Sequence, residues 1–141
     1  MTAWKTDNVP TQHCILIVDD EFGLAEMLRD MLCELDYDVA LAINGRLALE
    51  VLAERRIDLV LTDMMMPLMD GAELAGAMRT SEAHRRIPIV MMTSLPTVVP
   101  QQDGLFDAVL RKPFTPDLLL TTLHRCLGDS SDLNRSRDPE R

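Results

Sequence analysis

The chain alternates between two patterns of apolar residues, and this alternation is the main guide to its fold. One pattern is a short unbroken apolar run that ends in polar or turn-forming residues, as in a strand buried on both faces. The run over 59–63 ends in Asp63 and leads into a turn through Pro67 and the Asp70-Gly71 pair. Runs of this kind predict five strands, over residues 14–18, 37–43, 59–63, 89–93 and 108–111.

The other pattern repeats apolar residues every three or four positions, as one face of a helix requires. It predicts four helices, which begin near Phe22, Asn44, Gly71 and Thr115. Asp70 is expected to cap the third of these helices. The side chains expected to face inward are Ala25, Leu28, Leu32, Leu35, Leu47, Ala48, Val51, Leu52, Leu74, Ala75, Met78, Leu119, Leu120, Leu123 and Leu127.

The stretch over 94–104 fits neither pattern. Pro96 and Pro100 cannot both lie inside one regular helix, because each removes a donor and clashes with the preceding turn. We therefore expect a short or irregular helix at this point. The alternation as a whole predicts an α/β protein of the flavodoxin-like (βα)5 class, with a doubly wound parallel sheet of five strands in the order 2-1-3-4-5.

Composition and charge narrow the possible partners and compartment. A net charge of −9 argues against direct nucleic-acid binding, which needs Lys and Arg, and against an anionic membrane surface. The sequence shows no secretory signal and no apolar run of membrane-spanning length, so we expect a cytoplasmic protein. Its cysteines, Cys14, Cys33 and Cys126, suit neither a disulfide framework nor a zinc site and are interpreted as small buried hydrophobes. The three histidines share no spacing and are interpreted as surface residues.

The folded part is expected to form one domain over residues 12–128. Residues 1–11 are polar and aperiodic, which predicts a flexible N-terminal leader. Residues 129–141 have almost no apolar side chains to bury, which predicts a disordered C-terminal tail.

Polar residues follow four of the five predicted strands. Asp19 and Asp20 follow the first strand, and Asp63, Thr93 and Lys112 stand at the ends of three others. The carboxyl ends of parallel strands meet at one edge of the sheet, so we expect these side chains to converge. Neighbouring carboxylates repel one another unless a cation is present, and Mg²⁺ prefers oxygen ligands. With Lys112 as a fixed cation and Thr93 as a hydroxyl donor, the set suits a phosphoryl group attacked by a carboxylate.

Four short motifs in the same order resemble the receiver domain of two-component response regulators. They are VDDE at Val18–Glu21, DMMMPLMDG at Asp63–Gly71, MTS at Met92–Ser94 and KPF at Lys112–Phe114. Each motif is weak by itself, but the set in register with five predicted strands is specific. The similarity covers roughly residues 11–128.

The resemblance implies that Asp63 accepts a phosphoryl group from a histidine kinase or a histidine phosphotransfer protein. It implies a Mg²⁺ site made by Asp19, Asp20, the Asp63 carboxylate and the backbone carbonyl of Met65. It further implies that Thr93 is a switch hydroxyl and that Lys112 forms an ion pair with the phosphoryl group. The Lys112–Pro113 peptide bond is expected to be cis, as is usual in the family.

Two departures from the family bear on how a signal leaves the domain. Val109 occupies a position that is commonly aromatic in the family, so movement of Thr93 cannot be coupled to an aromatic ring there. The connection from Thr93 to Lys112 is also short and contains two prolines. Neither departure touches the acceptor chemistry.

The leading interpretation is a stand-alone receiver that switches a protein-interaction surface for a downstream target, is not an enzyme, and is monomeric unless phosphorylation drives dimerisation. A fragment of a larger regulator or hybrid kinase is the alternative origin of the chain. A rival function is an interaction module that does not use phosphorylation. Val109 and the irregular helix expected near residues 94–104 favour this alternative, whereas the presence of Asp19, Asp20 and Asp63 argues against it. A third is a Mg²⁺-dependent aspartyl phosphohydrolase, but Met65 stands where such an enzyme needs a second carboxylate.

Overall fold

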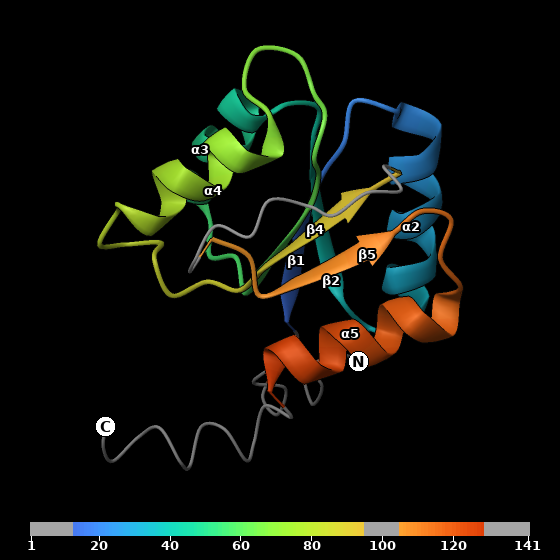
Figure 1. Cartoon of the computed structure of the whole chain (residues 1–141). Coiled ribbons are helices and arrows are strands. Elements are labelled where there is room, and N and C mark those ends of the chain that lie inside the picture. The colour runs from blue at the N-terminus through green and yellow to red at the C-terminus, as the bar shows by residue number, and fades with distance from the viewer. Residues whose placement is uncertain (1–12, 95–104, 129–141) are drawn as a thin grey trace.

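Each apolar run forms a strand in the computed structural model, which describes residues 13–94 and 105–128 (Figure 1). The second strand is one residue shorter at each end than predicted, since Tyr37 and Ile43 lie outside it. The expected leader, tail and irregular helix fall on residues outside the described ranges, apart from Ser94. The elements are β1 (Cys14–Val18), α2 (Phe22–Glu34), β2 (Asp38–Ala42), α3 (Gly45–Glu54), β3 (Leu59–Asp63), α4 (Gly71–Arg79), β4 (Ile89–Thr93), β5 (Ala108–Arg111) and α5 (Pro116–Leu127).

The strands form one parallel sheet in the order β2-β1-β3-β4-β5, which confirms the predicted topology. The register pairs Val18 with Thr62 and Asp63 with Met92, so the ends of β1, β3 and β4 lie side by side. Because every strand runs in the same direction, the polar residues that follow the strands gather at one edge of the sheet.

The sheet is covered on both faces. α2 and α5 pack on one face, and α3 and α4 pack on the other (Figure 1). Side chains alternate along β1, with Ile15 and Ile17 in the first layer and Leu16 and Val18 in the second. All five residues of β1 are buried, as the unbroken apolar run predicted.

Local capping sets the starts of three helices. The Asn44 side chain accepts from the Leu47 N–H, and Thr115 accepts from the Leu118 N–H. Asp70 and Glu73 form a reciprocal capping box at the start of α4, which confirms the expected Asp70 cap. Side-chain caps of this kind satisfy N–H groups that have no partner within the helix.

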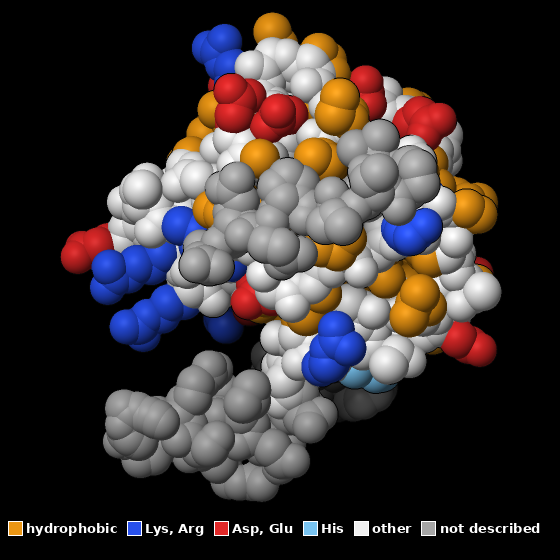
Figure 2. Space-filling model, in the orientation of Figure 1, with side chains coloured by type: hydrophobic (Ala, Val, Ile, Leu, Met, Phe, Trp, Pro, Cys, Tyr) orange, Lys and Arg blue, Asp and Glu red, His pale blue; other side chains and the backbone are white. Residues whose placement is uncertain are grey.

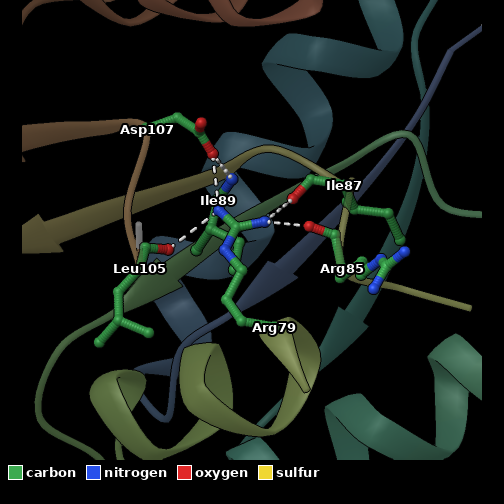
Figure 3. Close-up of polar contacts among 6 residues, drawn as sticks. All are labelled: Arg79, Arg85, Ile87, Ile89, Leu105 and Asp107. Carbon is green, nitrogen blue, oxygen red and sulfur yellow. Dashed lines mark hydrogen bonds and ion pairs between the residues drawn. The ribbon is translucent and has the colours of Figure 1, made fainter. Parts of the chain in front are cut away.

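A single arginine ties the end of α4 to the start of β5 (Figure 3). The Arg79 guanidinium donates to the backbone carbonyls of Arg85, Ile87 and Leu105 at 2.8–3.0 Å and to the Asp107 carboxylate at 2.8 Å. The same Asp107 oxygen accepts from the Ile89 N–H at 2.8 Å. The sequence analysis did not single out Arg79 or Asp107, yet together they join four segments of the chain.

Two predicted core positions are wrong. Leu35 is 46% exposed because it is the C-cap of α2 and no longer follows the buried stripe of the helix. Leu47 is 39% exposed because it lies in the first turn of α3, beside the outer edge of the sheet. Most of the other expected inward positions are buried, including Ala25, Leu74 and Leu119.

The interpretation of the cysteines and histidines also needs correction. Cys14 is buried as expected, but Cys33 is exposed on the solvent side of α2 and Cys126 is half-buried. His84 is half-buried, and its Nε2 lies 3.1 Å from the Leu52 carbonyl oxygen. No described helix has the length and apolar character needed to cross a membrane.

Candidate functional site

Three carboxylates converge at the carboxyl edge of the sheet. Asp19 and Asp20 follow β1, and Asp63 ends the neighbouring strand β3. One oxygen atom from each of the three side chains lies within 4.8 Å of the others. Adjacent strand ends therefore bring together residues that are more than forty positions apart in the sequence.

Asp19 is the most buried member of this cluster. Its backbone N–H donates to the Ala42 carbonyl at 3.0 Å, and its Oδ1 accepts from the Glu21 N–H at 2.9 Å. Its Oδ2 is also buried and accepts no hydrogen bond among the described residues, although the Lys112 ammonium lies 3.5 Å away. A buried carboxylate oxygen without a donor is costly. This atom is a ready ligand for a cation.

Lys112 supplies the positive charge of the site. Its Nζ lies 3.2 Å from Asp63 Oδ1 and 3.5 Å from Asp19 Oδ2. The side chains of all three residues are at most 16% exposed, so water screens these ion pairs only weakly. The Lys112–Pro113 peptide bond is cis, as predicted.

The pKa values of Asp19 and Asp63 are both shifted by burial and by the charges around them. Burial raises the pKa of Asp63, and the nearby Lys112 charge opposes that rise. Burial also raises the pKa of Asp19, with the Asp63 charge adding to the rise and Lys112 opposing it. One lysine does not fully offset the burial of two carboxyls, so the cluster favours a further cation.

The backbone around Asp63 is held closely by its neighbours. The Thr62 hydroxyl donates to the Asp63 carbonyl at 2.9 Å, and the Gly71 N–H donates to the Met64 carbonyl at 2.9 Å. A Cβ atom at Gly71 would lie 2.5 Å from the Asp63 carbonyl oxygen. Only glycine permits this close approach. The sequence analysis identified Gly71 as a turn residue and as the start of a helix, but did not predict this close approach.

The residues of the cluster fit a hard divalent cation. Carboxylate oxygens are the ligands that Mg²⁺ prefers, and the buried Asp19 Oδ2 lacks a donor. The described residues bring no histidine or cysteine into the cluster, as a zinc site would require.

The structure brings together four of the six predicted site residues, namely Asp19, Asp20, Asp63 and Lys112. Thr93 ends β4 with its side chain buried, and its carbonyl accepts from the Lys112 N–H at 2.7 Å. Met65 lies in the β3–α4 loop with a side chain that is 64% exposed. The role of its carbonyl as a ligand remains a prediction.

An apolar groove of about 510 Å³ opens beside the cluster. It lies between α2 and the segment from Lys112 to α5, and Lys112 itself lines it. Figure 2 shows hydrophobic side chains gathered on this side of the molecule, over α2 and the end of β5. The apolar lining includes Leu24, Met27, Met31, Pro113, Phe114 and Pro116. A groove of this kind beside a reactive site suits the apolar face of a protein partner.

Comparisons with known proteins agree with this geometry. Residues 15–124 match the family described as the response regulator receiver domain. The chain is 33% identical to the chemotaxis response regulator CheY4 of Vibrio cholerae, with a TM-score of 0.75 over 83% of this chain and all of that one. It is 29% identical to the receiver domain of sensor histidine kinase PA1611 from Pseudomonas aeruginosa, with a TM-score of 0.76 over 84% of this chain and 99% of that one. That structure has a magnesium ion coordinated in its active-site cleft.

Among curated proteins, the DNA-binding response regulator MtrA of Mycolicibacterium paratuberculosis is 37% identical over 121 residues. The alignment covers 84% of this chain and 52% of MtrA, so the chain spans about half the length of the curated relatives it matches. Because such relatives include DNA-binding regulators, they do not support the expectation of no contact with nucleic acid.

Proposed function

The chain belongs to the response regulator receiver family, whose members interact with histidine kinases, and we propose that it is a phospho-accepting switch. In this proposal Asp63 takes a phosphoryl group from a histidine kinase or a histidine phosphotransfer protein in a Mg²⁺-dependent reaction. The observation that carries the proposal is the cluster of Asp19, Asp20 and Asp63 with the Lys112 ammonium 3.2 Å from Asp63.

The transfer replaces one bond to phosphorus by another. An Asp63 carboxylate oxygen forms a bond to phosphorus as the N–P bond of the donor phosphohistidine breaks, and the imidazole leaves. Lys112 is placed to pair with the phosphoryl oxygens, because its Nζ already lies beside the Asp63 carboxylate. Asp19, Asp20, Asp63 and the Met65 carbonyl would hold Mg²⁺. When bound, that ion supplies positive charge to the phosphoryl oxygens.

Thr93 and Lys112 connect the acceptor to the rest of the fold. Thr93 is proposed to move its hydroxyl toward the phosphoryl group once Asp63 is modified. Its carbonyl is hydrogen-bonded to the Lys112 N–H, and this bond is the proposed route by which a shift at the end of β4 would reach the end of β5. Val109, 43% exposed on β5, offers no aromatic ring for this movement to act through. The altered surface is proposed to bind a downstream protein.

The apolar groove between α2 and the Lys112–Pro116 segment is the proposed docking site of the phosphodonor. A helix that presents a phosphohistidine can place its apolar residues there while the phosphoryl group faces Asp63. Met27 and Met31 line the groove, and flexible methionine side chains suit adaptable binding surfaces. We further propose that the protein is cytoplasmic. We also propose that it is a switch and not an enzyme, and that it dephosphorylates itself slowly at most.

Intact-mass spectrometry after incubation with a small-molecule phosphodonor tests the proposal. The wild-type chain should gain one phosphoryl group with Mg²⁺ present and much less without it, whereas Asp63→Asn should gain none. Asp70→Asn is the matched control, because Asp70 lies in the same loop but caps α4, and Asn is an equally good cap. If the wild-type chain gains nothing while a control receiver is modified, the phosphorylation-independent module is the better interpretation.

A further inference from the structure

The outer edge of the sheet carries a second groove, distinct from the one beside Lys112. β2 is an edge strand and pairs, among the described strands, only with β1. A groove of about 380 Å³ lies beside it, with walls from α2 and α3. Its apolar lining consists of Phe22, Ala25, Leu41, Ala42, Ile43, Leu47 and Val51.

Several of these apolar side chains are exposed to solvent. Phe22 is 56% exposed, Ile43 is 48% exposed and Leu47 is 39% exposed. Single exposed apolar residues are common on soluble proteins, but three around one groove form an apolar patch of the kind that binds partners. The patch draws on three successive elements of the chain, α2, the end of β2 and α3.

Among the described residues, no strand pairs with the outer side of the β2 backbone along this groove. Asp38 donates its N–H to the His13 carbonyl at 2.9 Å, and Ala42 accepts from the Asp19 N–H at 3.0 Å. Backbone groups alternate in direction along a strand, so those of Val39 and Leu41 point away from β1. An edge with unpaired N–H and C=O groups is a template for another strand.

The groove lies on both sides of this edge. Leu41 packs with the layer of α2 and α5, whereas Ala42 packs with the layer of α3 and α4, and both line the groove. A strand added beside β2 would point its side chains alternately toward α2 and α3. The apolar lining on each side fits this alternation.

The rim of the groove is acidic. Glu50 and Glu54 line it from α3, are both exposed, and form no ion pair within the described part of the chain. Like charges four residues apart destabilise a helix slightly, so this pair is a cost that a basic partner would relieve. Charge complementarity therefore selects a partner segment that carries Lys or Arg.

We propose that this groove is a docking site for an extended segment of a partner protein, which adds to β2 as a further strand and carries alternating apolar and basic residues. Main-chain hydrogen bonds to Val39 and Leu41 would give affinity, and the apolar lining with Glu50 and Glu54 would give specificity. The proposal does not depend on phosphorylation of Asp63.

The probe is a short capped peptide that alternates Val and Lys. Amide hydrogen exchange and titration followed by NMR should show new protection at the Val39 and Leu41 amides. The Ala40 amide is the internal control, because it already faces β1. Replacing Lys by Glu in the peptide, or N-methylating all its backbone amides, should abolish this protection. The double variant Glu50→Gln/Glu54→Gln should weaken binding about two- to tenfold, whereas Glu82→Gln, exposed in the α4–β4 loop, should not.

Three results would overturn the proposal. Equal binding of the N-methylated peptide would show that no strand is added. Protection confined to the groove beside Lys112 would place the peptide elsewhere. Protection of Val39 and Leu41 that grows with protein concentration, without any peptide, would show that a second copy of the chain occupies the edge instead.

Discussion

The backbone N–H of Lys112 donates to the carbonyl of Thr93 at 2.7 Å, which fastens the end of β5 to the end of β4 beside the carboxylate cluster. The hydrogen bond places the Lys112 ammonium next to the strand that carries the buried Thr93 hydroxyl. Asp63 stands on the other side of Thr93, because β3 pairs with β4. The acidic, cationic and hydroxyl groups of the site thus come from the ends of four adjacent strands, β1, β3, β4 and β5.

Removing the Lys112 charge should affect both stability and phosphoryl uptake. In Lys112→Met, the buried Asp19 and Asp63 lose their cation, so we expect the free energy of unfolding at pH 7 to fall by about 1–3 kcal/mol. Phosphoryl uptake at Asp63 should fall strongly even with Mg²⁺ present. Denaturant titration and intact-mass spectrometry measure the two effects, with Arg111→Met, the exposed last residue of β5, as the control. Uptake at the wild-type rate in Lys112→Met would contradict the assigned role.

The raised pKa of Asp19 predicts a pH-dependent effect of Asp19→Asn in Mg²⁺-free buffer. A carboxyl whose pKa is higher in the folded than in the unfolded chain contributes stability below its ordinary pKa of 3.8 and loses that contribution as the pH rises through the folded value. Asp19→Asn removes this loss. The variant should therefore become more stable relative to wild type as the pH rises from 3 toward 7.

Equilibrium unfolding from pH 3 to pH 8 measures this difference between the two proteins. Asp30→Asn, exposed on α2, is the control for the removal of an exposed carboxyl group. Saturating Mg²⁺ should reverse the order at pH 7, because the ion stabilises only a protein that binds it, by about 2.7 kcal/mol at a hundredfold excess over the Kd. A variant that loses stability relative to wild type as the pH rises would refute the assignment of Asp19.

Two glycines of α4 should respond in opposite ways to alanine. At Gly71 the added Cβ would meet the Asp63 carbonyl oxygen at 2.5 Å, and this backbone atom cannot easily give way. Gly71→Ala should lower the free energy of unfolding by about 1–3 kcal/mol and slow phosphoryl uptake. At Gly76 a Cβ meets nothing within 4 Å, so Gly76→Ala should raise stability by about 0.5–1 kcal/mol. A stable, fully active Gly71→Ala would show that the loop tolerates the added methyl group.

The contacts of Arg79 should make it sensitive to a charge-conserving substitution (Figure 3). Lysine cannot reach three carbonyls and the Asp107 carboxylate at once, so Arg79→Lys leaves half-buried acceptors unpaired. We expect a loss of about 2–3 kcal/mol in unfolding free energy by denaturant titration. Arg85→Lys is the control, because only its carbonyl takes part in these contacts, and it should stay within about 0.5 kcal/mol of wild type. Equal stability of the two variants would mean that the contacts contribute little.

The local patterns of the sequence were sufficient for the elements and their order. The bounds of β3, α4, β4 and β5 agree with the predictions, because apolar runs and capping residues act over a few positions. The sheet order followed from the alternation of strands and helices. The convergence of Asp19, Asp20, Asp63 and Lys112 followed in turn, since parallel strands end at one edge.

Some contacts could be seen only in the tertiary structure, because they join a side chain or a glycine to the backbone of a segment distant in the sequence. Gly71 is required by the Asp63 carbonyl, and Arg79 is held mainly by carbonyls, which every residue possesses and which leave no sequence signal. Asp19 and Asp20 are adjacent and identical, yet the fold buries the first and exposes the second. Leu47 has the spacing of a core residue, but β2 is the edge strand of the sheet in the part of the chain that the structure describes, and no further strand there buries Leu47. Sequence periodicity indicates which face of an element is apolar, whereas the packing of the sheet and helices determines which residues of that face are buried.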